Sequence, residues 1–368
     1  MTLRHLYVHV PLCARRCSYC DFAIAVRRVI PVDEYVGALS AEVAARAGER
    51  GDNELDTLYL GGGTPSLLGT TGISNIVKLA TRYFGLSSTA EVTIEANPDD
   101  VTPEAARSWL ASGVNRVSLG VQSFDDRVLG WMHRTHDSAQ AIAAVRHLRN
   151  AGFDNISVDL IFALPESLER SWSTDLSRAL DLEPDHISLY GLTIEPATPL
   201  ARWKDRGTVS PAGEDRYAED FLLAGEFTRD RGYEHYEVSN FARGGKRSRH
   251  NSAYWSGAEY LGAGPSAHSF DAASRTWNIA PYAAWVASIR ERGTGVEGTE
   301  TLTSENRLAE RVYLGLRTKS GLAVAGSDLE VAAGWARQGW AKVTEGIVRL
   351  TPEGWLRLDS LAASLTGS

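Results

Sequence analysis

The stretch LRHLYVHVPLCARRCSYCDF, residues 3–22, decides which fold and which chemistry we expect of this chain. A β-rich apolar run over residues 3–10 leads directly into Cys13, Cys17 and Cys20. These are the only cysteines among the 368 residues. An odd number of cysteines packed so closely is not the pattern of a disulfide framework, and it indicates a reducing compartment.

Three interpretations of the C-x3-C-x2-C spacing are open. Three buried free thiols are the simplest, but core cysteines have no reason to recur in one loop. A zinc ion bound by the three cysteines and His9 is the second, although structural zinc sites usually combine two ligand pairs. The third is a 4Fe–4S cluster held through three of its irons, which leaves the fourth iron open to S-adenosylmethionine. The later motifs favour this third interpretation.

Six β-rich apolar runs alternate with helical patterns along the first half of the chain. The runs are LRHLYVHV, LDTLYLGG, AEVTIEAN, RVSLGVQS, NISVDLIFAL and HISLYGLTIE. One intervening helix is expected to begin at the N-cap Thr102 and to end at Gly113, and another to end at Gly152. Parallel strands need crossover connections, so this order predicts an α/β fold with a partial (βα)6 barrel of the TIM type. The stretch YEHYEVSN, residues 233–240, is expected as one further strand.

The C-terminal third follows a different pattern. Residues 303–318 are expected as a capped helix, and residues 339–365 as a hairpin followed by a helix. This order suits a small helical, winged-helix-like domain. We therefore expect three parts: a barrel domain over 1–240, a connecting segment over 241–300 that ends in the linker GTGVEGTET, and a C-terminal domain over 301–368.

Composition and charge narrow the class of protein. Hydrophobic residues make up 43% and charged residues 23% of the chain, which is typical of a globular protein. The net charge of −8 argues against a general nucleic-acid binder. The first residues lack the apolar core of a signal peptide, and no apolar run reaches membrane-spanning length. We expect a cytoplasmic protein.

Polar residues stand at the ends of the otherwise apolar runs. GGGTPS, residues 61–66, follows the second run and lacks the Gly-Lys-Ser/Thr ending of a phosphate-binding P-loop. Further polar residues near the ends of later strands are Glu95, Gln122, Arg134 and Asp159. Each alone could be a solvated strand end. Because ligands bind at the carboxyl ends of parallel strands, the set predicts a ligand site there.

Residues 3 to about 270 resemble the coproporphyrinogen dehydrogenase family within the radical S-adenosylmethionine superfamily. The resemblance rests on the cysteine spacing after the first strand, on Tyr19 just before the last cysteine, on GGGTPS and on the polar strand ends. It implies a 4Fe–4S cluster on the three cysteines, with Tyr7 packed beside the cluster and the cofactor. The implied contacts of S-adenosylmethionine are Gly62, Gly63 and Thr64 at its methionine end, Glu95 and Arg134 at its amino and carboxylate groups, and Gln122 and Asp159 at its ribose.

By two features the chain resembles one branch of that family more narrowly, the heme chaperones long labelled coproporphyrinogen oxidase-like. The dehydrogenases carry a further cysteine two positions after the third, and here that position is Phe22. The second feature is RHNSAYW, with the pattern H-N-x-x-Y-W. A loop histidine beside two core aromatics would explain it structurally, whereas a neutral imidazole is also a ready axial ligand for heme iron. The resemblance implies heme binding by His250 together with Asn251, Tyr254 and Trp255.

By this resemblance we expect a cytoplasmic heme chaperone that binds a 4Fe–4S cluster, S-adenosylmethionine and heme, and that delivers heme to membrane-bound respiratory proteins. Any association with the membrane would run through those partners, and a homodimer is left open. One alternative is an oxygen-independent coproporphyrinogen III oxidase, which Phe22 argues against because it supplies no thiol. The other is a radical S-adenosylmethionine enzyme that acts on an unrelated substrate.

Overall fold

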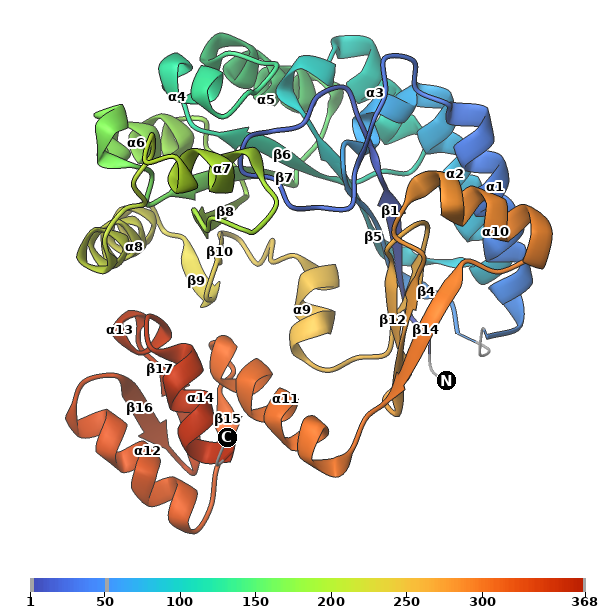
Figure 1. Cartoon of the computed structure of the whole chain (residues 1–368). Coiled ribbons are helices and arrows are strands. Elements are labelled where there is room, and N and C mark those ends of the chain that lie inside the picture. Colours follow the sequence, from blue (N-terminus) through green and yellow to red (C-terminus); the bar gives the residue numbers. More distant parts are fainter. Residues whose placement is uncertain (1–2, 50–52, 367–368) are drawn as a thin grey trace.

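Residues 3–49 and 53–366, which the computed structural model describes, fold around one nine-stranded sheet (Figure 1). Six neighbouring strands of this sheet run parallel to one another. In sheet order they are β1 (His5–Val10), β4 (Leu55–Gly62), β5 (Leu86–Ala96), β6 (Arg116–Gln122), β7 (Ile156–Phe162) and β8 (His186–Gly191). They coincide with the six apolar runs, so the predicted α/β partial barrel is confirmed.

Helices cover the outer side of the parallel strands and connect them (Figure 1). Side chains alternate between the two sides of each strand. On β1, Leu6, Val8 and Val10 are buried in the apolar core that includes the helices, whereas Tyr7 meets Tyr59 of β4. The connecting helices are α1 (Val32–Arg46), α2 (Gly69–Phe84), α3 (Pro103–Ala111), α4 (Asp126–Trp131), α5 (Ser138–Ala151) and α6 (Trp172–Asp181), and after β8 come α7 (Pro199–Asp205) and α8 (Glu214–Asp230).

The helix signals in the sequence act as predicted. Thr102 accepts a hydrogen bond from the backbone N of Ala105 and begins α3. Asp137 forms a capping box with Gln140 at the start of α5. Gly152 ends α5 with a φ of 107°, a left-handed conformation that glycine adopts without a steric penalty.

Antiparallel strands form the β8 edge of the sheet. β10 (Asn240–Ala242) pairs with β8, and β9 (Glu234–Glu237) pairs with β10. The further strand predicted over 233–240 is present as β9, but it ends at Glu237 because the chain turns back there. The buried carboxylate of Glu237 accepts hydrogen bonds from Ser239 N and from the side chain of the next residue. This local pairing stabilises a turn that strand periodicity does not reveal.

The connecting segment forms the other edge of the sheet and a second small sheet. β14 lies in the stretch expected as a linker, so that expectation is wrong. The strand is mostly exposed and lacks apolar alternation, and its Gly298 lies so close to Trp277 that a Cβ atom would be 2.3 Å from the indole. The elements of this segment are α9 (Arg249–Trp255), β11 (Leu261–Ala263), which pairs in parallel with β1, β12 (His268–Phe270), β13 (Ser274–Asn278), α10 (Tyr282–Arg292) and β14 (Val296–Thr301).

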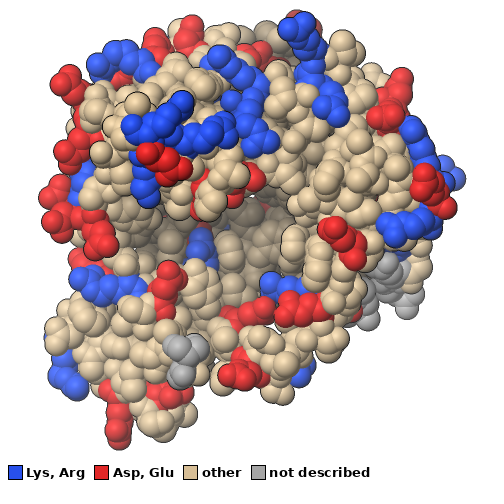
Figure 2. Space-filling view, viewed as in Figure 1, with Lys and Arg blue, Asp and Glu red and all other residues tan. Residues whose placement is uncertain are grey.

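The C-terminal region is a smaller domain around a three-stranded sheet, as expected. The predicted hairpin is present, and the helix expected after it is divided in two. The elements are α11 (Ser304–Arg317), β15 (Leu322–Ala323), α12 (Ser327–Arg337), β16 (Ala341–Thr344), β17 (Ile347–Leu350), α13 (Pro352–Trp355) and α14 (Leu358–Thr366). Viewed from the same side, the surface is hollowed between this region and the barrel (Figure 2). Across 3–49 and 53–366, none of the helices has both the length and the apolar character that crossing a membrane requires.

Candidate functional site

A cavity of about 390 Å³ lies at the carboxyl ends of the parallel strands. Most of the site residues expected from the sequence lie on its wall, although they come from six separate segments of the chain. They are Cys13, Cys17, Cys20, Gly62, Gly63, Thr64, Glu95, Gln122, Arg134 and Asp159. The structure thus brings the cysteine loop and the polar strand ends together around one space.

Two very short strands hold the base of the cysteine loop. β2 (Leu12–Cys13) pairs in parallel with β3 (Ala25–Val26), so the loop leaves and re-enters at the same place. The Sγ of Cys13 lies 3.4 Å from Thr64 Oγ1, and Arg134 Nη1 donates to the Sγ of Cys17 over 3.4 Å. Burial raises the pKa of the Cys20 thiol to about 11. A bound metal would favour the thiolate instead, because its positive charge reverses this effect.

The residues of the loop fit a cluster better than they fit zinc. The three cysteines are free thiols that face one cavity, and Phe22, 58% exposed, offers no fourth sulfur. His9 was the fourth ligand of the zinc interpretation. Its Nδ1 lies 3.1 Å from the Tyr7 hydroxyl and its Nε2 lies 3.0 Å from the carbonyl oxygen of Ala23, so both ring nitrogens are engaged within the protein.

The glycines after β4 let the chain pass close to β1. Gly62 has a φ of 109°, and a Cβ atom there would lie 2.5 Å from the ring of His9. At Gly63 a Cβ atom would lie 2.8 Å from the backbone of Pro11. Side chains at either position would therefore push this loop away from the cysteine loop. The close approach explains why GGGTPS lies on the cavity wall.

Glu95 is held by two donors at the base of the cavity. The Tyr59 hydroxyl donates to Oε1 over 2.8 Å, and the backbone N of Gly62 donates to Oε2 over 2.9 Å. Burial raises the pKa of Glu95 to about 6, and these two hydrogen bonds oppose the increase. The carboxylate is thus fixed in position, with a pKa above the ordinary value of a glutamate.

Arg134 combines fixed contacts with one donor that has no partner. Its Nη2 donates to Asn97 Oδ1 over 2.6 Å and to the carbonyl oxygen of Gly120 over 2.8 Å. Its Nε is buried without a hydrogen-bond partner. A buried orphan donor is costly in a folded protein. Arg134 also lies on the wall of the cavity, so its positive charge suits an anionic group there, such as the carboxylate of S-adenosylmethionine.

The two residues expected at the ribose lie on neighbouring strands. Gln122 has a φ of 67° at an irregularity in the pairing of β6 with β7. Asp159 on β7 accepts hydrogen bonds from Ser118 Oγ over 2.9 and 3.1 Å and from Ser157 Oγ over 2.9 Å. Burial raises the pKa of Asp159, and the surrounding serine hydroxyls oppose this effect. Tyr7, expected beside the cluster and the cofactor, does not line the cavity. Its hydroxyl lies 3.1 Å from His9 Nδ1.

The H-N-x-x-Y-W motif lies on α9, at the opposite end of the barrel from the cavity. His250 is 1% exposed. Its Nδ1 lies 2.6 Å from Thr57 Oγ1 and its Nε2 lies 2.9 Å from the Tyr254 hydroxyl. Glu91 on β5 accepts hydrogen bonds from the backbone N of His250 and of the residue before it, which holds the start of α9. Burial lowers the pKa of His250 to about 3, so the imidazole is neutral.

The other residues of the motif surround His250 without reaching the cavity. The guanidinium of Arg317 on α11 lies 4.2 Å from the centre of the Trp255 ring, which ties α9 to the C-terminal region. The backbone N of Asn251 donates to Ser248 Oγ, the N-cap of α9. None of these motif residues lies on the wall of the cavity. The sequence motifs therefore mark two separate places in the fold.

Comparison with known proteins identifies the family of the chain. Residues 7–174 match the family described as the radical SAM superfamily. The chain is 34% identical to the heme chaperone HemW of Bacillus subtilis, over 87% of this chain and 85% of that protein. This chain belongs to the HemW family of the radical SAM superfamily. It is also 33% identical to the HemW of Mycobacterium tuberculosis, over 98% and 94% of the two chains.

The fold of this HemW-family chain also occurs in a protein outside the HemW branch. The coproporphyrinogen III oxidase HemN of Escherichia coli superposes with a TM-score of 0.83 at 24% identity, over 98% of this chain and 89% of that one. This likeness concerns the fold, including the C-terminal domain.

Several residues at the site were not expected from the sequence. Tyr59 contacts Glu95 and Ser118 contacts Asp159. The apolar runs in the sequence predicted their strands but did not single out either residue. Asn97 pairs with Arg134, and it follows Glu95 by two positions at a predicted strand end. Its position close to Glu95 at the end of a predicted strand could have marked it as a site residue. Tyr190 on β8 also lies on the cavity wall, 46% exposed.

Proposed function

We propose that this protein is a heme-binding chaperone that carries a 4Fe–4S cluster and binds S-adenosylmethionine in the cavity at the strand ends. The observation that carries the proposal is the convergence of three free cysteines, Glu95 and Arg134 on one cavity. Relatives that share about a third of its residues over most of its length are named heme chaperone HemW.

In the proposed arrangement, Cys13, Cys17 and Cys20 hold the cluster as thiolates. When bound, the cluster can supply one electron to the sulfonium of S-adenosylmethionine. Glu95 accepts the amino group of this cofactor, and the positive charge of Arg134 attracts its carboxylate. The remaining proposed contacts are Gly62, Gly63 and Thr64 along the methionine and Gln122 and Asp159 at the ribose.

For heme, we propose His250 as the axial ligand, with Asn251, Tyr254 and Trp255 around it. The neutral imidazole has the protonation state that an iron ligand needs. Its Nε2 is paired with the Tyr254 hydroxyl, so coordination requires α9 to open and this hydrogen bond to break. Trp255 could then offer its ring to a porphyrin face. The proposed receivers of the heme are membrane-bound respiratory proteins, and the proposed location is the cytoplasm.

The proposal is tested by anaerobic reconstitution of the cluster, followed by heme titration and an assay for 5′-deoxyadenosine. We expect a brown protein that binds S-adenosylmethionine and gives a defined Soret band with heme. A reconstituted protein without heme binding that still releases 5′-deoxyadenosine would instead support a radical enzyme with another substrate. A protein that binds zinc and forms no stable iron–sulfur species would contradict the assignment of the three cysteines to a cluster, and with it the proposal.

A further inference from the structure

The turn that carries Gln122 is strained. Gln122 has a φ of 67°, and the backbone N of Ser123 donates to the carbonyl oxygen of Val121 over 2.8 Å. A hydrogen bond across one residue with positive φ defines the rare form of the γ-turn, which a residue with a side chain adopts only when its surroundings enforce it. The turn places Gln122 on the wall of the cavity.

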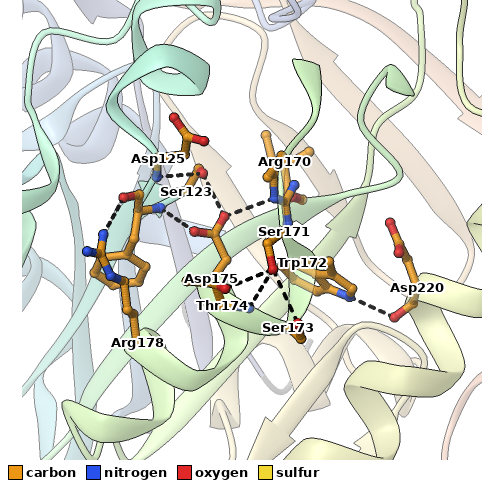
Figure 3. Close-up of polar contacts among 12 residues, drawn as sticks. Ser123, Asp125, Arg170, Ser171, Trp172, Ser173, Thr174, Asp175, Arg178 and Asp220 are labelled. Atoms are coloured by element: carbon orange, nitrogen blue, oxygen red, sulfur yellow. Dashed lines mark hydrogen bonds and ion pairs between the residues drawn. The ribbon is translucent and has the colours of Figure 1, made fainter. Parts of the chain in front are cut away.

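A buried carboxylate on α6 holds this turn from behind (Figure 3). Asp175 accepts a hydrogen bond from Ser123 Oγ over 2.6 Å and one from the backbone N of Phe124 over 2.9 Å. Asp175 is 2% exposed and Ser123 is fully buried. From the same helix, Arg178 Nη1 donates to the carbonyl oxygen of Phe124 over 2.7 Å. Both polar groups of the Phe124 backbone are therefore bound by α6.

An arginine just before α6 neutralises the carboxylate. Arg170 Nε lies 3.0 Å from Asp175 Oδ2, and the side chains of this pair are 5% and 3% exposed. Arg170 in turn is fixed by its donation to the carbonyl oxygen of Ile161 over 2.7 Å. Burial raises the pKa of Asp175, and Arg170 is the main group that opposes this change. A buried ion pair contributes little net stability, and in some proteins such pairs serve to fix one geometry.

We propose that Asp175 is a positioning residue for the cofactor: it holds the γ-turn at Gln122 and thereby keeps this side chain directed at the ribose of S-adenosylmethionine. The inference rests on the proposed function, because it requires the cavity to bind this cofactor. Asp175 does not line the cavity, so it acts on the cofactor indirectly. The turn is the direct route, and the path through Arg170 to Ile161 is the alternative that the test must separate.

A second buried aspartate nearby provides a matched control. Asp220 on α8 accepts a hydrogen bond from the backbone N of Ala163 over 3.1 Å and pairs with Arg216 over 3.0 Å. It is 5% exposed, and its backbone oxygen accepts from Trp172 Nε1 (Figure 3). Asp220 thus resembles Asp175 in burial and pairing but has no contact with the turn at Gln122. Asp220→Asn should cost stability without changing the affinity for S-adenosylmethionine.

The test is a double-mutant cycle between Asp175→Asn and Gln122→Ala. Calorimetric titration of the cluster-loaded protein gives the Kd for S-adenosylmethionine, and the cluster absorption checks that the cysteine loop is intact. We expect Asp175→Asn to raise the Kd about tenfold, the effect of losing one hydrogen bond to a charged group. In the Gln122→Ala background the same substitution should change the Kd no further. Ser123→Ala, which removes one arm of the contact and keeps the ion pair, should show the same pattern with a smaller effect.

The outcomes separate the inference from the proposed function. An unchanged Kd in Asp175→Asn and Ser123→Ala would overturn the positioning role. So would an equal loss of affinity with and without Gln122, because it would show that Asp175 acts by another route. If the parent protein itself failed to bind S-adenosylmethionine, both the proposed function and this inference would fall.

Discussion

The ring of His250 stacks on the ring of Tyr59, with their centres 5.1 Å apart. Tyr59 in turn donates its hydroxyl hydrogen bond to Glu95. One side chain therefore contacts both His250 on the H-N-x-x-Y-W helix and Glu95 on the wall of the cavity. Because packed side chains transmit displacement to their neighbours, a movement of α9 would reach Glu95 through Tyr59.

Removing the hydroxyl of Tyr59 should shift the pH dependence of S-adenosylmethionine binding. Tyr59→Phe keeps the stacked ring but removes a hydrogen bond that opposes the raised pKa of Glu95. In this variant the pKa of Glu95 is higher than its value of about 6 in the parent protein, so the carboxyl group stays protonated up to a higher pH. Calorimetry should show weaker binding by about threefold or more at mildly acidic pH, and less change at mildly alkaline pH.

Tyr233→Phe is the control for this prediction. The hydroxyl of Tyr233 is also buried and hydrogen-bonded, but its acceptor is the carbonyl oxygen of Pro184 just before β8, and neither residue lines the cavity. Its pH profile should match that of the parent. Superimposable profiles for Tyr59→Phe and the parent would show that Glu95 does not bind the amino group as a carboxylate.

Replacing any one of the three cysteines should abolish the iron–sulfur cluster. Cys17→Ala removes a thiol that faces the cavity beside Arg134, and two thiols hold a cluster of this kind poorly. Anaerobic reconstitution should leave the variant without the brown absorption of the parent. Phe22→Ala serves as the control, because this exposed side chain supplies no ligand, and it should retain the full cluster spectrum. A Cys17→Ala protein with the parent's iron content would refute the assignment.

His250→Ala should remove the specific heme spectrum. The substitution deletes the only histidine of the motif and breaks its contacts with Thr57 and Tyr254. We expect the Soret band of the heme-titrated protein to shift or disappear, and thermal unfolding to show a loss of about 2–3 kcal/mol from the buried hydrogen bonds and the empty space. His268→Ala is the comparison, since His268 lies on the exposed side of β12. An unchanged spectrum in His250→Ala together with a changed one in His268→Ala would move the ligand to β12.

Acid should weaken the attachment of the C-terminal domain through His235. The ring of His235 on β9 lies between Phe241 and Trp355 of α13, with centres 3.9 and 4.3 Å away. Burial lowers the pKa of His235 to about 4, the carbonyl oxygen of Val238 raises it, and Lys319 lowers it. The unfolded chain therefore takes up this proton first as the pH falls. Stability is present above the unfolded pKa of about 6.5 and is lost between there and about pH 4, by up to about 1.4 kcal/mol per pH unit.

His235→Gln should flatten this pH dependence. Denaturant unfolding at several pH values in this range should give a smaller slope for the variant than for the parent, and the difference isolates His235 from the other titrating groups. Equal slopes would mean that His235 is not kept neutral by its position against α13.

The barrel and the cavity could be predicted because they depend on local patterns. Each strand has its own apolar run. The carboxyl ends of parallel strands lie on the same face of the barrel, however the side chains pack. Glu95 and Asp159 were therefore expected at one place. Asp175 was not, because its role depends on the contact of α6 with a turn more than fifty positions earlier. The burial of His250 under Tyr59 likewise follows from α9 packing against the barrel, which periodicity does not reveal.

Titration of heme into the reconstituted protein, with coproporphyrinogen III offered to the same preparation under reducing conditions, tests the central claim most directly. The three thiols at the cavity, the side chain of Phe22 without a fourth sulfur, and the neutral imidazole of His250 predict a saturable Soret band and no protoporphyrinogen. Formation of protoporphyrinogen without a defined Soret band would contradict the account and identify the protein as an enzyme of porphyrin synthesis.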